Sequence, residues 1–168
     1  PRKDLVKFDI LKSYNKIINS VKDIDLMRIF EIYDNKNDVW FNNIKKTVTN
    51  DQLQFIIPIN SNNGLIMSSY TELHNSKYWL KLYNKNYINF KNTLNNKLSI
   101  AFNKHVPQSK WLKLHYWDMG VGSWKKNVNS DYISEKVLNL LPNFYICGEN
   151  YSKNQAWCEG SLDTASKV

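Results

Sequence analysis

The sequence of 168 residues is poor in several residue types, and each shortage argues against a class of protein. Its two cysteines, Cys147 and Cys158, provide neither a disulfide framework nor a metal-binding spacing, so we expect a reduced protein of the cytoplasm. The histidines lack metal-ligand spacing and a partner for nucleophilic catalysis; they are His74, His105 and His115. No apolar run approaches the roughly 20 residues of a membrane span. We therefore expect no metal ion and no membrane-spanning segment.

Arginine is almost absent, since only Arg2 and Arg28 occur in a chain with 23 basic residues. A formal net charge of +8 would suit a nucleic-acid partner, but the lysines are scattered along the chain. Proteins that read grooves and phosphates rely on arginine, whose planar guanidinium offers forked donors. The abundance of lysine, asparagine and isoleucine is typical of a coding bias toward AT-rich codons. We therefore expect no nucleic-acid partner.

Glycine is also scarce, and none of the five glycines builds a phosphate-binding loop. Gly120 and Gly122 lack the third glycine and the helix that a G-x-G-x-x-G loop requires. The sequence starts at Pro1 rather than at a methionine, and its last helical pattern still runs at Val168. These features predict an incomplete chain.

What the sequence does contain is enough apolar material for a folded domain. Hydrophobic residues make up 42% of the chain and aromatic residues 14%, and the length suits one domain. Periodicity and turn signals predict helices over 4–20, 72–82 and 90–102, and strands over 26–33, 52–59, 65–70 and 110–117. A loop at 60–64 joins two of these strands into a hairpin. Residues 118–142 are mostly loop, with a short helical piece around 133–141.

The segregation of these helices from a cluster of antiparallel strands predicts an α+β fold. Strict βαβ alternation is not visible, and no internal repeat is apparent.

The most informative stretch lies near the end of the chain. Residues 142–149 read PNFYICGE, in which an apolar run ends abruptly at Gly148-Glu149. This pattern predicts a buried strand over 143–147 that delivers a carboxylate at its C-terminal end. Residues 157–162 read WCEGSL and open a helical pattern from about residue 160. A strand end with an acid, followed by a helix N-terminus, is how α/β proteins hold a nucleotide cofactor.

This segment resembles the C-terminal FAD-closing motif of the flavin-containing amine oxidases, the superfamily of monoamine and polyamine oxidases. The shared pattern is an apolar strand, Gly-Glu, a short polar loop, an aromatic residue, Glu-Gly and a small residue. Weaker likenesses to the middle and late segments of the family lie at 56–59, at 68–71 with Trp79, and at 116–125.

The resemblance implies two parts. Residues 1–117 would form a portion of the substrate-binding domain, in which an antiparallel sheet backed by helices roofs the flavin. Residues 118–168 would close the Rossmann-like FAD domain. The family carries its G-x-G-x-x-G loop near the N-terminus, so the resemblance also implies that the N-terminal half of the same chain is a missing partner.

The activity that the resemblance implies is oxidation of an amine C–N bond to an imine, with O2 reoxidising the flavin to give H2O2. The substrate would be a small-molecule amine. Some relatives attach flavin to a cysteine in the late region, but no cysteine lies between residues 109 and 127, so we expect noncovalent FAD. Two alternatives stay open. One is a flavoenzyme of the same fold with another substrate, such as an amino-acid oxidase or a carotenoid desaturase; the other is a catalytically degenerate binding module.

The cofactor-binding residues that the resemblance implies are Gly148, Glu149, Trp157, Glu159, Gly160 and Ser161. The carboxylate of Glu149 would accept hydrogen bonds from ribityl or ribose hydroxyls, unless it is an ordinary exposed loop residue. The helix start at Gly160 and Ser161 would face the N1 and C2 carbonyl edge of the flavin, where reduced flavin carries negative charge. Gly160 would permit close approach of the backbone to the ring.

Aromatic residues are expected to line the path of the amine. Trp157 stands where many amine oxidases present an aromatic face to the substrate, and a ring face suits an amine. The alternative for Trp157 is core packing. Tyr116, Trp117 and Trp124 would line the cavity opposite Trp157, although each of them alone is more typical of a core.

Arg28 departs from the family pattern. Many amine oxidases carry a lysine on a substrate-domain strand, linked through a water to flavin N5, and Arg28 falls on that strand. We therefore treat Arg28, with Trp157, as a predicted catalytic residue. A guanidinium is always charged and is not equivalent to an amine. The alternative is a structural salt bridge, for example with Glu31 or with an acid outside this sequence.

Overall fold

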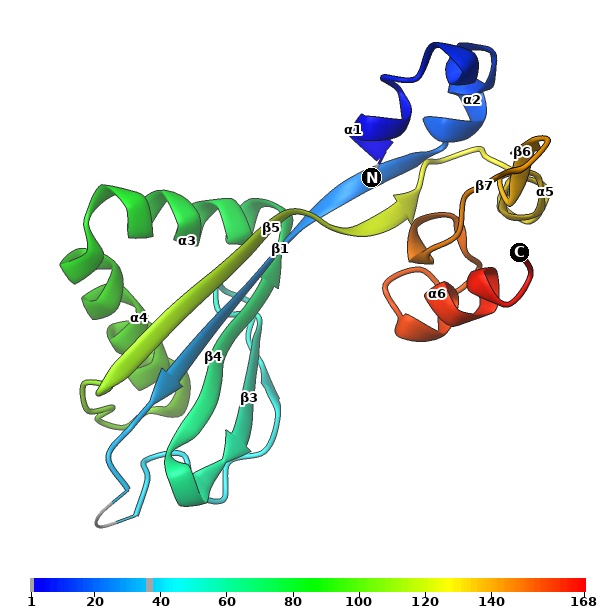
Figure 1. Cartoon of the computed structure of the whole chain (residues 1–168). Helices are drawn as coiled ribbons and strands as arrows, with labels where there is room; N and C mark the ends of the chain where they lie inside the picture. Colours follow the sequence, from blue (N-terminus) through cyan, green and yellow to red (C-terminus); the bar gives the residue numbers. More distant parts are fainter. Residues whose placement is uncertain (1, 36–37) are drawn as a thin grey trace. The chain divides into compact units, whose positions relative to one another are not determined.

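The computed structural model describes residues 2–35 and 38–168 of the chain (Figure 1). The chain divides into two compact units, one made of the first 24 residues with residues 119–168, the other of residues 25–118. Strands β1 (Val21–Ile32) and β5 (Trp111–Trp124) contribute residues to both. One division lies beside the predicted boundary between 117 and 118, whereas the first 24 residues group with the C-terminal segment. The functional meaning of the two parts stays a prediction.

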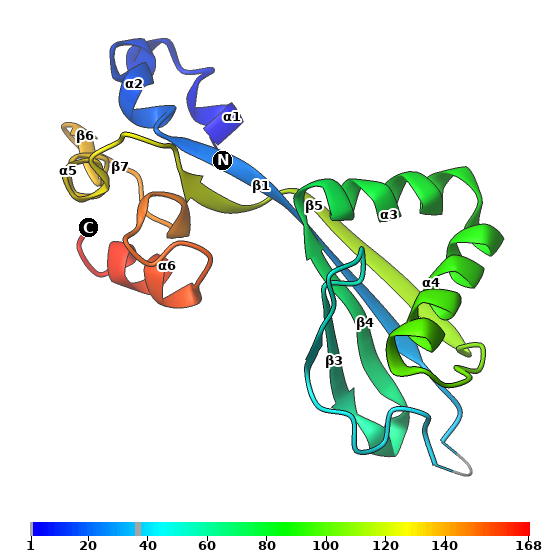
Figure 2. The ribbon, with the colours of Figure 1, turned by 180° about the vertical axis from the view of Figure 1, so that it is seen from behind.

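The unit of residues 25–118 is built on a five-stranded antiparallel sheet, as the α+β prediction requires. The strand order is β2-β3-β4-β1-β5, with β2 (Thr47–Val48), β3 (Phe55–Asn60) and β4 (Leu65–Glu72). Helices α3 (Leu73–Lys85) and α4 (Tyr87–Phe102) pack on one face of this sheet (Figure 1, Figure 2). The two predicted helices at 72–82 and 90–102 are confirmed.

The hairpin of β3 and β4 is also confirmed, and its turn explains one glycine. A short 3-10 turn, η2 (Ser61–Asn63), is capped by Asn60, whose side chain accepts from the Asn62 N–H. Gly64 follows with a φ of 73°, and a Cβ there would lie 2.2 Å from the carbonyl oxygen of Tyr33. Only glycine fits this turn without strain.

The core of this unit follows from the alternation of β1. Met27, Ile29 and Tyr33 point to the helix-covered face, because successive strand residues face opposite sides. The helices contribute Trp79, Phe90, Leu94 and Leu98 to the same cluster. The loop between β1 and β3 completes it with Val39, Phe41 and Leu53.

A polar group is buried within this core. The register of β1 against β4 shifts between Ile29 and Phe30, which makes Ser68 the extra residue of a β-bulge. The Ser68 hydroxyl donates to the carboxylate of Glu31, and the Tyr33 hydroxyl donates to it at 2.9 Å. Glu31 is only 2% exposed. Burial raises the pKa of the Glu31 carboxyl, and the hydrogen bonds from Ser68 and Tyr33 oppose this shift.

The other unit is made of short elements. They are α1 (Arg2–Leu5), η1 (Asp9–Tyr14), α2 (Asn15–Ile18), α5 (Ser130–Lys136), β6 (Asn139–Leu141), β7 (Phe144–Tyr145), η3 (Glu149–Tyr151) and α6 (Cys158–Ala165), besides the outer parts of β1 and β5. Their apolar residues form a second core cluster around Leu11, Ile18, Val137 and Tyr151. Within the described residues, no helix has the length and apolar character that a membrane crossing demands.

The predicted helix over 4–20 is wrong, since three short pieces occupy this range. Phe8 has the extended backbone angles φ −83° and ψ 115°, which end the first turn. Leu11 and Ile18 are buried as the pattern required, but Phe8 and Ile10 are exposed, so the apolar residues do not share one face. The same range contains Asp9, Ser13 and Asn15, and side chains of these types compete with helical backbone hydrogen bonds.

The buried strand predicted over 143–147 is also wrong. Strand β7 contains only Phe144 and Tyr145 and pairs with β6 in a two-stranded sheet. Phe144 and Ile146 pack against the second core cluster, whereas Tyr145 and Cys147 are exposed. A continuous apolar run is typical of a strand that is buried on both faces. In this segment the second core cluster covers only the face of Phe144 and Ile146.

Several other boundaries differ from prediction. Strand β1 begins at Val21, five residues before the predicted start at 26. Strand β5 continues seven residues past the predicted end at 117, to Trp124, into a range predicted as loop. The helical piece predicted over 133–141 begins earlier, as α5, and its last residues form β6 instead.

Candidate functional site

The segment from Gly148 onward is held by side chains of its own unit. Gly148 has a φ of 133°, a conformation that favours glycine. Its N–H donates to the hydroxyl of Thr164 at 2.8 Å, and that hydroxyl lies 2.9 Å from the carbonyl oxygen of Gly160. One threonine on α6 thereby joins the helix to the point where the apolar run ends.

Glu149 uses both carboxylate oxygens within the chain. Its Oε1 accepts from the N–H of Gly122 on β5 at 2.9 Å, and its Oε2 accepts from the N–H of Ala156 at 2.8 Å. The side chain therefore connects the end of β5 to the loop that precedes α6. A carboxylate oxygen can accept two hydrogen bonds, so each oxygen retains capacity for a ligand hydroxyl.

Gly160 is explained by a contact within the chain. A Cβ at this position would lie 2.2 Å from Oγ of Ser152 and 2.3 Å from the carbonyl oxygen of Asn154. The loop at 152–154 thus fills the space that a side chain would occupy. A close approach of this glycine to a flavin stays a prediction.

The first turn of α6 is not capped by a side chain. Trp157 occupies the N-cap position with extended backbone angles and makes no capping hydrogen bond. It is 69% exposed, so it is no core residue of this chain. With Asn154 and Glu159 it lines a hollow of about 280 Å³. Of the first-turn N–H groups, that of Gly160 donates to the carbonyl oxygen of Trp157 at 3.2 Å. The positive end of the helix dipole still favours an acceptor or an anion here.

Two further predicted residues lie at this helix start. Glu159 is exposed, and its own backbone N–H and the Cys158 thiol lower the pKa of its carboxyl. Ser161 is half-buried.

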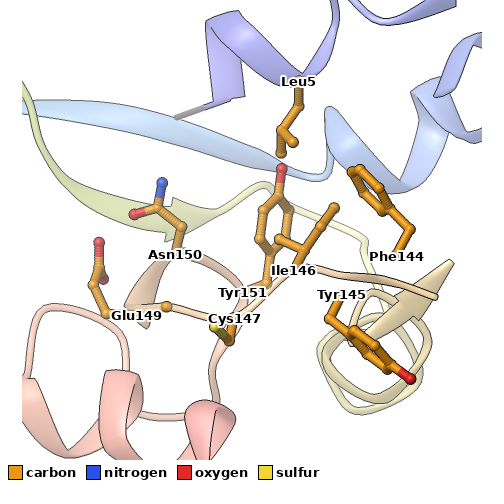
Figure 3. Close-up of a pocket in the computed structure, with 9 residues that line it drawn as sticks. Leu5, Phe144, Tyr145, Ile146, Cys147, Glu149, Asn150 and Tyr151 are labelled. Carbon is orange, nitrogen blue, oxygen red and sulfur yellow. The ribbon is translucent and has the colours of Figure 1, made fainter. Parts of the chain in front are cut away.

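A larger pocket of about 440 Å³ lies beside this segment (Figure 3). It is lined by Leu5 and residues 144–151, which are mainly apolar. Tyr151 is one of the lining residues, and its hydroxyl donates to the carbonyl oxygen of Ile18 at 2.8 Å. The two predicted cofactor residues Gly148 and Glu149 thus stand at the rim of a real cavity.

Arg28 lies in the other unit, on the sheet face that the helices leave uncovered. It pairs with Tyr70 across β1 and β4, and its guanidinium carbon is 4.8 Å from the centroid of the Tyr70 ring. The same carbon is 5.9 Å from the Trp117 ring on β5. The structure thus brings together two predicted site residues, Arg28 and Trp117, and adds Tyr70, which the sequence reasoning missed.

The salt bridge weighed for Arg28 with Glu31 is absent. The two residues lie three positions apart on one strand and therefore face opposite sides of the sheet. Among the described residues no carboxylate forms an ion pair with Arg28. Its Nε is buried and makes no hydrogen bond to the described chain.

Aromatic rings continue on both sides of this arginine. Phe55 is 6.1 Å from Tyr70, His115 stacks on Trp117 at 5.9 Å, and Phe30 meets His115 edge-on at 6.0 Å. We call this set the aromatic face: Arg28, Phe30, Phe55, Tyr70, His115 and Trp117. The sequence contained a signal for this face, because its residues alternate along their strands with the residues of the core.

The remaining aromatic residues predicted for the cavity belong to cores. Tyr116 alternates with Trp117 and packs against the helix-covered cluster. Burial, followed by the nearby carboxylate of Asp25, raises the pKa of the Tyr116 hydroxyl. Trp124 packs against Tyr151 in the second cluster at 6.4 Å. Tyr116 and Trp124 thus pack against different clusters, and the cavity that they would line with Trp117 stays a prediction.

The predicted site residues thus fall into two groups, one in each unit. One comprises the helix start with Trp157 and the Gly148–Glu149 corner; the other is the aromatic face around Arg28. In comparisons of the sequence with known proteins, no family model and no curated protein matches. The likeness to amine oxidases therefore rests on the motif residues themselves.

Proposed function

We propose that this chain forms part of an FAD-dependent amine oxidase. The enzyme oxidises the C–N bond of a small amine to an imine, and O2 reoxidises the flavin to give H2O2. The observation that carries the proposal is the corner at 148–161. There the Gly-Glu pair, a short loop and an uncapped helix start beside an exposed Trp157 follow one another in the order of the family motif.

The residues at this corner fit a flavin in two respects. The positive end of the α6 dipole, at a start that no side chain caps, suits the edge of a flavin that becomes negative on reduction. Glu149 retains acceptor capacity while its two backbone contacts fix its direction. FAD, when bound, supplies the hydride acceptor. The sequence itself contains no G-x-G-x-x-G loop for the pyrophosphate, which the rest of the enzyme would provide.

The aromatic face supplies the substrate side of this proposal. Tyr70 and Trp117 offer ring surfaces, and Arg28 stands where relatives carry a lysine. A guanidinium keeps its charge at every physiological pH, so this residue orients a water or an anion and takes up no proton. Trp157, exposed at the start of α6, offers a further aromatic surface to an amine.

The alternatives are distinguished by particular observations. Arg28 without a carboxylate partner favours an amino-acid oxidase of the same fold over a carotenoid desaturase, whose substrate carries no anionic group. The internal bonds of Glu149 would also suit a degenerate binding module, since they hold the corner without any cofactor.

The test is flavin reduction in protein made from the complete reading frame that contains this chain. We expect stoichiometric, dialysis-resistant FAD, anaerobic bleaching of the flavin by amines, and H2O2 on readmission of air. Trp157→Phe should keep bleaching and Trp157→Ala should slow it strongly, because the ring face is what the amine contacts. Protein that holds FAD but is bleached by no amine or amino acid would favour the degenerate module. Protein without FAD would overturn the proposal.

A further inference from the structure

We propose that Arg28 and the two rings beside it form a carboxylate-binding site, and that the ligand of the aromatic face is a small molecule carrying a carboxylate next to an apolar group. The inference rests on the proposed function only where it assigns the ligand of this site the role of substrate. It names the substrate class as amino acids rather than simple amines. The binding site itself is argued from residues 25–118 alone.

The guanidinium is held in place without being neutralised. Tyr70 on β4 and Trp117 on β5 flank it at 4.8 Å and 5.9 Å, so rings from the two neighbouring strands limit its motion. Ring faces stabilise the cation but accept no strong hydrogen bond from it. Its in-plane donors are therefore left for a planar acceptor, which a carboxylate meets with two parallel bonds.

The chain itself does not satisfy this demand. Nε of Arg28 is buried and lacks a hydrogen-bond partner among the described residues. This atom has almost no accessible surface, so a carboxylate would bind end-on through the two terminal guanidinium nitrogens, which make no hydrogen bond to the described residues. Glu31 and Asp25 each lie three residues from Arg28 along β1. Glu31 faces the core and already accepts from Ser68 and Tyr33, and Asp25 pairs with Lys77 at 3.0 Å. Glu72 lies two residue pairs beyond Tyr70 on β4, and among the described residues it forms no ion pair with Arg28.

The surroundings select the rest of the ligand. Phe30, Phe55 and His115 extend the rings outward from Arg28, and Trp117 is 43% exposed. An apolar or aromatic group attached to the carboxylate would cover these rings. A simple ammonium ion would meet a fixed positive charge at the centre of this surface, so Arg28 disfavours it. The geometry therefore points to amino acids with an apolar side chain.

The experiment is a titration of the ¹⁵N-labelled chain, observed at the Nε–H of Arg28 and the indole N–H of Trp117. Only two arginines occur in the chain, so Arg28→Met assigns the signal. The probes are phenylacetate, its neutral analogue 2-phenylethanol, 2-phenylethylamine and phenyl phosphate. We expect phenylacetate to shift both signals and to bind at least about tenfold more tightly than 2-phenylethanol, with 2-phenylethylamine weakest.

The variants decide whether Arg28 is responsible. Arg28→Met should abolish the preference for phenylacetate over 2-phenylethanol. Lys113→Met, which removes a charge from an exposed residue of β5, should keep it. If Arg28→Met loses its dispersed spectrum, Arg28→Lys becomes the deciding variant. It keeps the charge but loses the fork, and we expect severalfold weaker phenylacetate binding.

Three results would overturn the proposal. They are equal binding of phenylacetate and 2-phenylethanol, a preference that survives in Arg28→Met or is undiminished in Arg28→Lys, or one that disappears equally in Lys113→Met. Tighter binding of phenyl phosphate than of phenylacetate would replace the carboxylate with a phosphate. No flavin takes part in these titrations, so failure here leaves the flavin proposal standing. Absence of FAD from the complete protein would equally leave the carboxylate site intact.

Discussion

Glu149 can hold its own segment in place and still accept a hydrogen bond from a ligand. Its oxygens bind the backbone N–H groups of Gly122 and Ala156, and these bonds aim the carboxylate at the corner where α6 begins. A carboxylate fixed in this way is better placed for a ligand hydroxyl than one that moves freely in a loop, because less side-chain entropy is lost on binding.

Replacement of Glu149 should therefore affect stability before any cofactor is considered. Glu149→Gln exchanges one acceptor oxygen for an amide that opposes a backbone N–H. We expect the free energy of unfolding to fall by about 1–3 kcal/mol. Urea denaturation followed by circular dichroism measures this change. Glu135→Gln is the matched control, since Glu135 is exposed on α5 and should leave the midpoint nearly unchanged. Equal midpoints for Glu149→Gln and the parent chain would contradict the structural task.

Glu31 gives a pH-dependent prediction at the same scale. Burial raises the pKa of its carboxyl in the folded chain above the ordinary value of 4.5. The folded state then holds this proton more tightly than the unfolded state. The contribution of Glu31 to stability is therefore complete below the unfolded pKa and is lost as the pH rises through the folded pKa.

Glu31→Gln removes this titration while keeping an acceptor for Tyr33 and Ser68. We expect the variant to gain stability relative to the parent chain as the pH rises from about 4.5 toward neutrality. Urea midpoints of both proteins, taken at several pH values, measure the difference. A difference that does not vary with pH would show that Glu31 has no raised pKa.

At the scale of elements, the sequence predicted best where one face of an element is covered by the chain's own core. Helices α3 and α4 and the β3–β4 hairpin were found from their periodicity and from the turn at Gly64. The prediction of one helix over 4–20 was wrong because the apolar residues in this range do not share one buried face: Leu11 and Ile18 are buried, whereas Phe8 and Ile10 are exposed. The strand over 143–147 failed because an apolar run does not reveal how many of its faces are covered.

The candidate site was predictable to a similar degree and for similar reasons. Arg28 and Trp117 were singled out, and they do lie together on neighbouring strands. Tyr70 was missed because an aromatic residue on a strand is usually assigned to a core, and only the register of β1 against β4 places it beside Arg28. The internal bonds of Glu149 depend on loop geometry, which no sequence pattern specifies.

Gly160 leads to a prediction about the whole of helix α6. Gly160→Ala would bring a methyl group against the backbone carbonyl of Asn154, which cannot rotate away. We expect α6 to shift at its start and the unfolding free energy to fall by about 1–3 kcal/mol. Hydrogen exchange along α6 should quicken with it. Ser161→Ala, on the next residue of the same helix, is the control and should change neither quantity. Unaltered exchange in Gly160→Ala would place the loop at 152–154 elsewhere.

At the scale of the whole molecule, the two groups of residues make different demands on the rest of the enzyme. The aromatic face is complete within residues 25–118, so its ligand binding depends on this unit alone. The corner at 148–161 offers a flavin only one helix start and one carboxylate. The pyrophosphate, which carries the charge of FAD, finds no glycine-rich loop in this sequence.

The 168-residue chain by itself should therefore bind carboxylates at Arg28 but retain no FAD. After refolding with excess FAD and dialysis, we expect a colourless protein whose Trp117 indole signal still shifts with phenylacetate. Visible absorption spectra and the same titration measure the two properties in one sample. A yellow chain with one flavin per molecule would mean that the corner binds the cofactor without a pyrophosphate loop. In that case Glu149 and the start of α6 contribute far more affinity than one helix dipole and one carboxylate ordinarily provide.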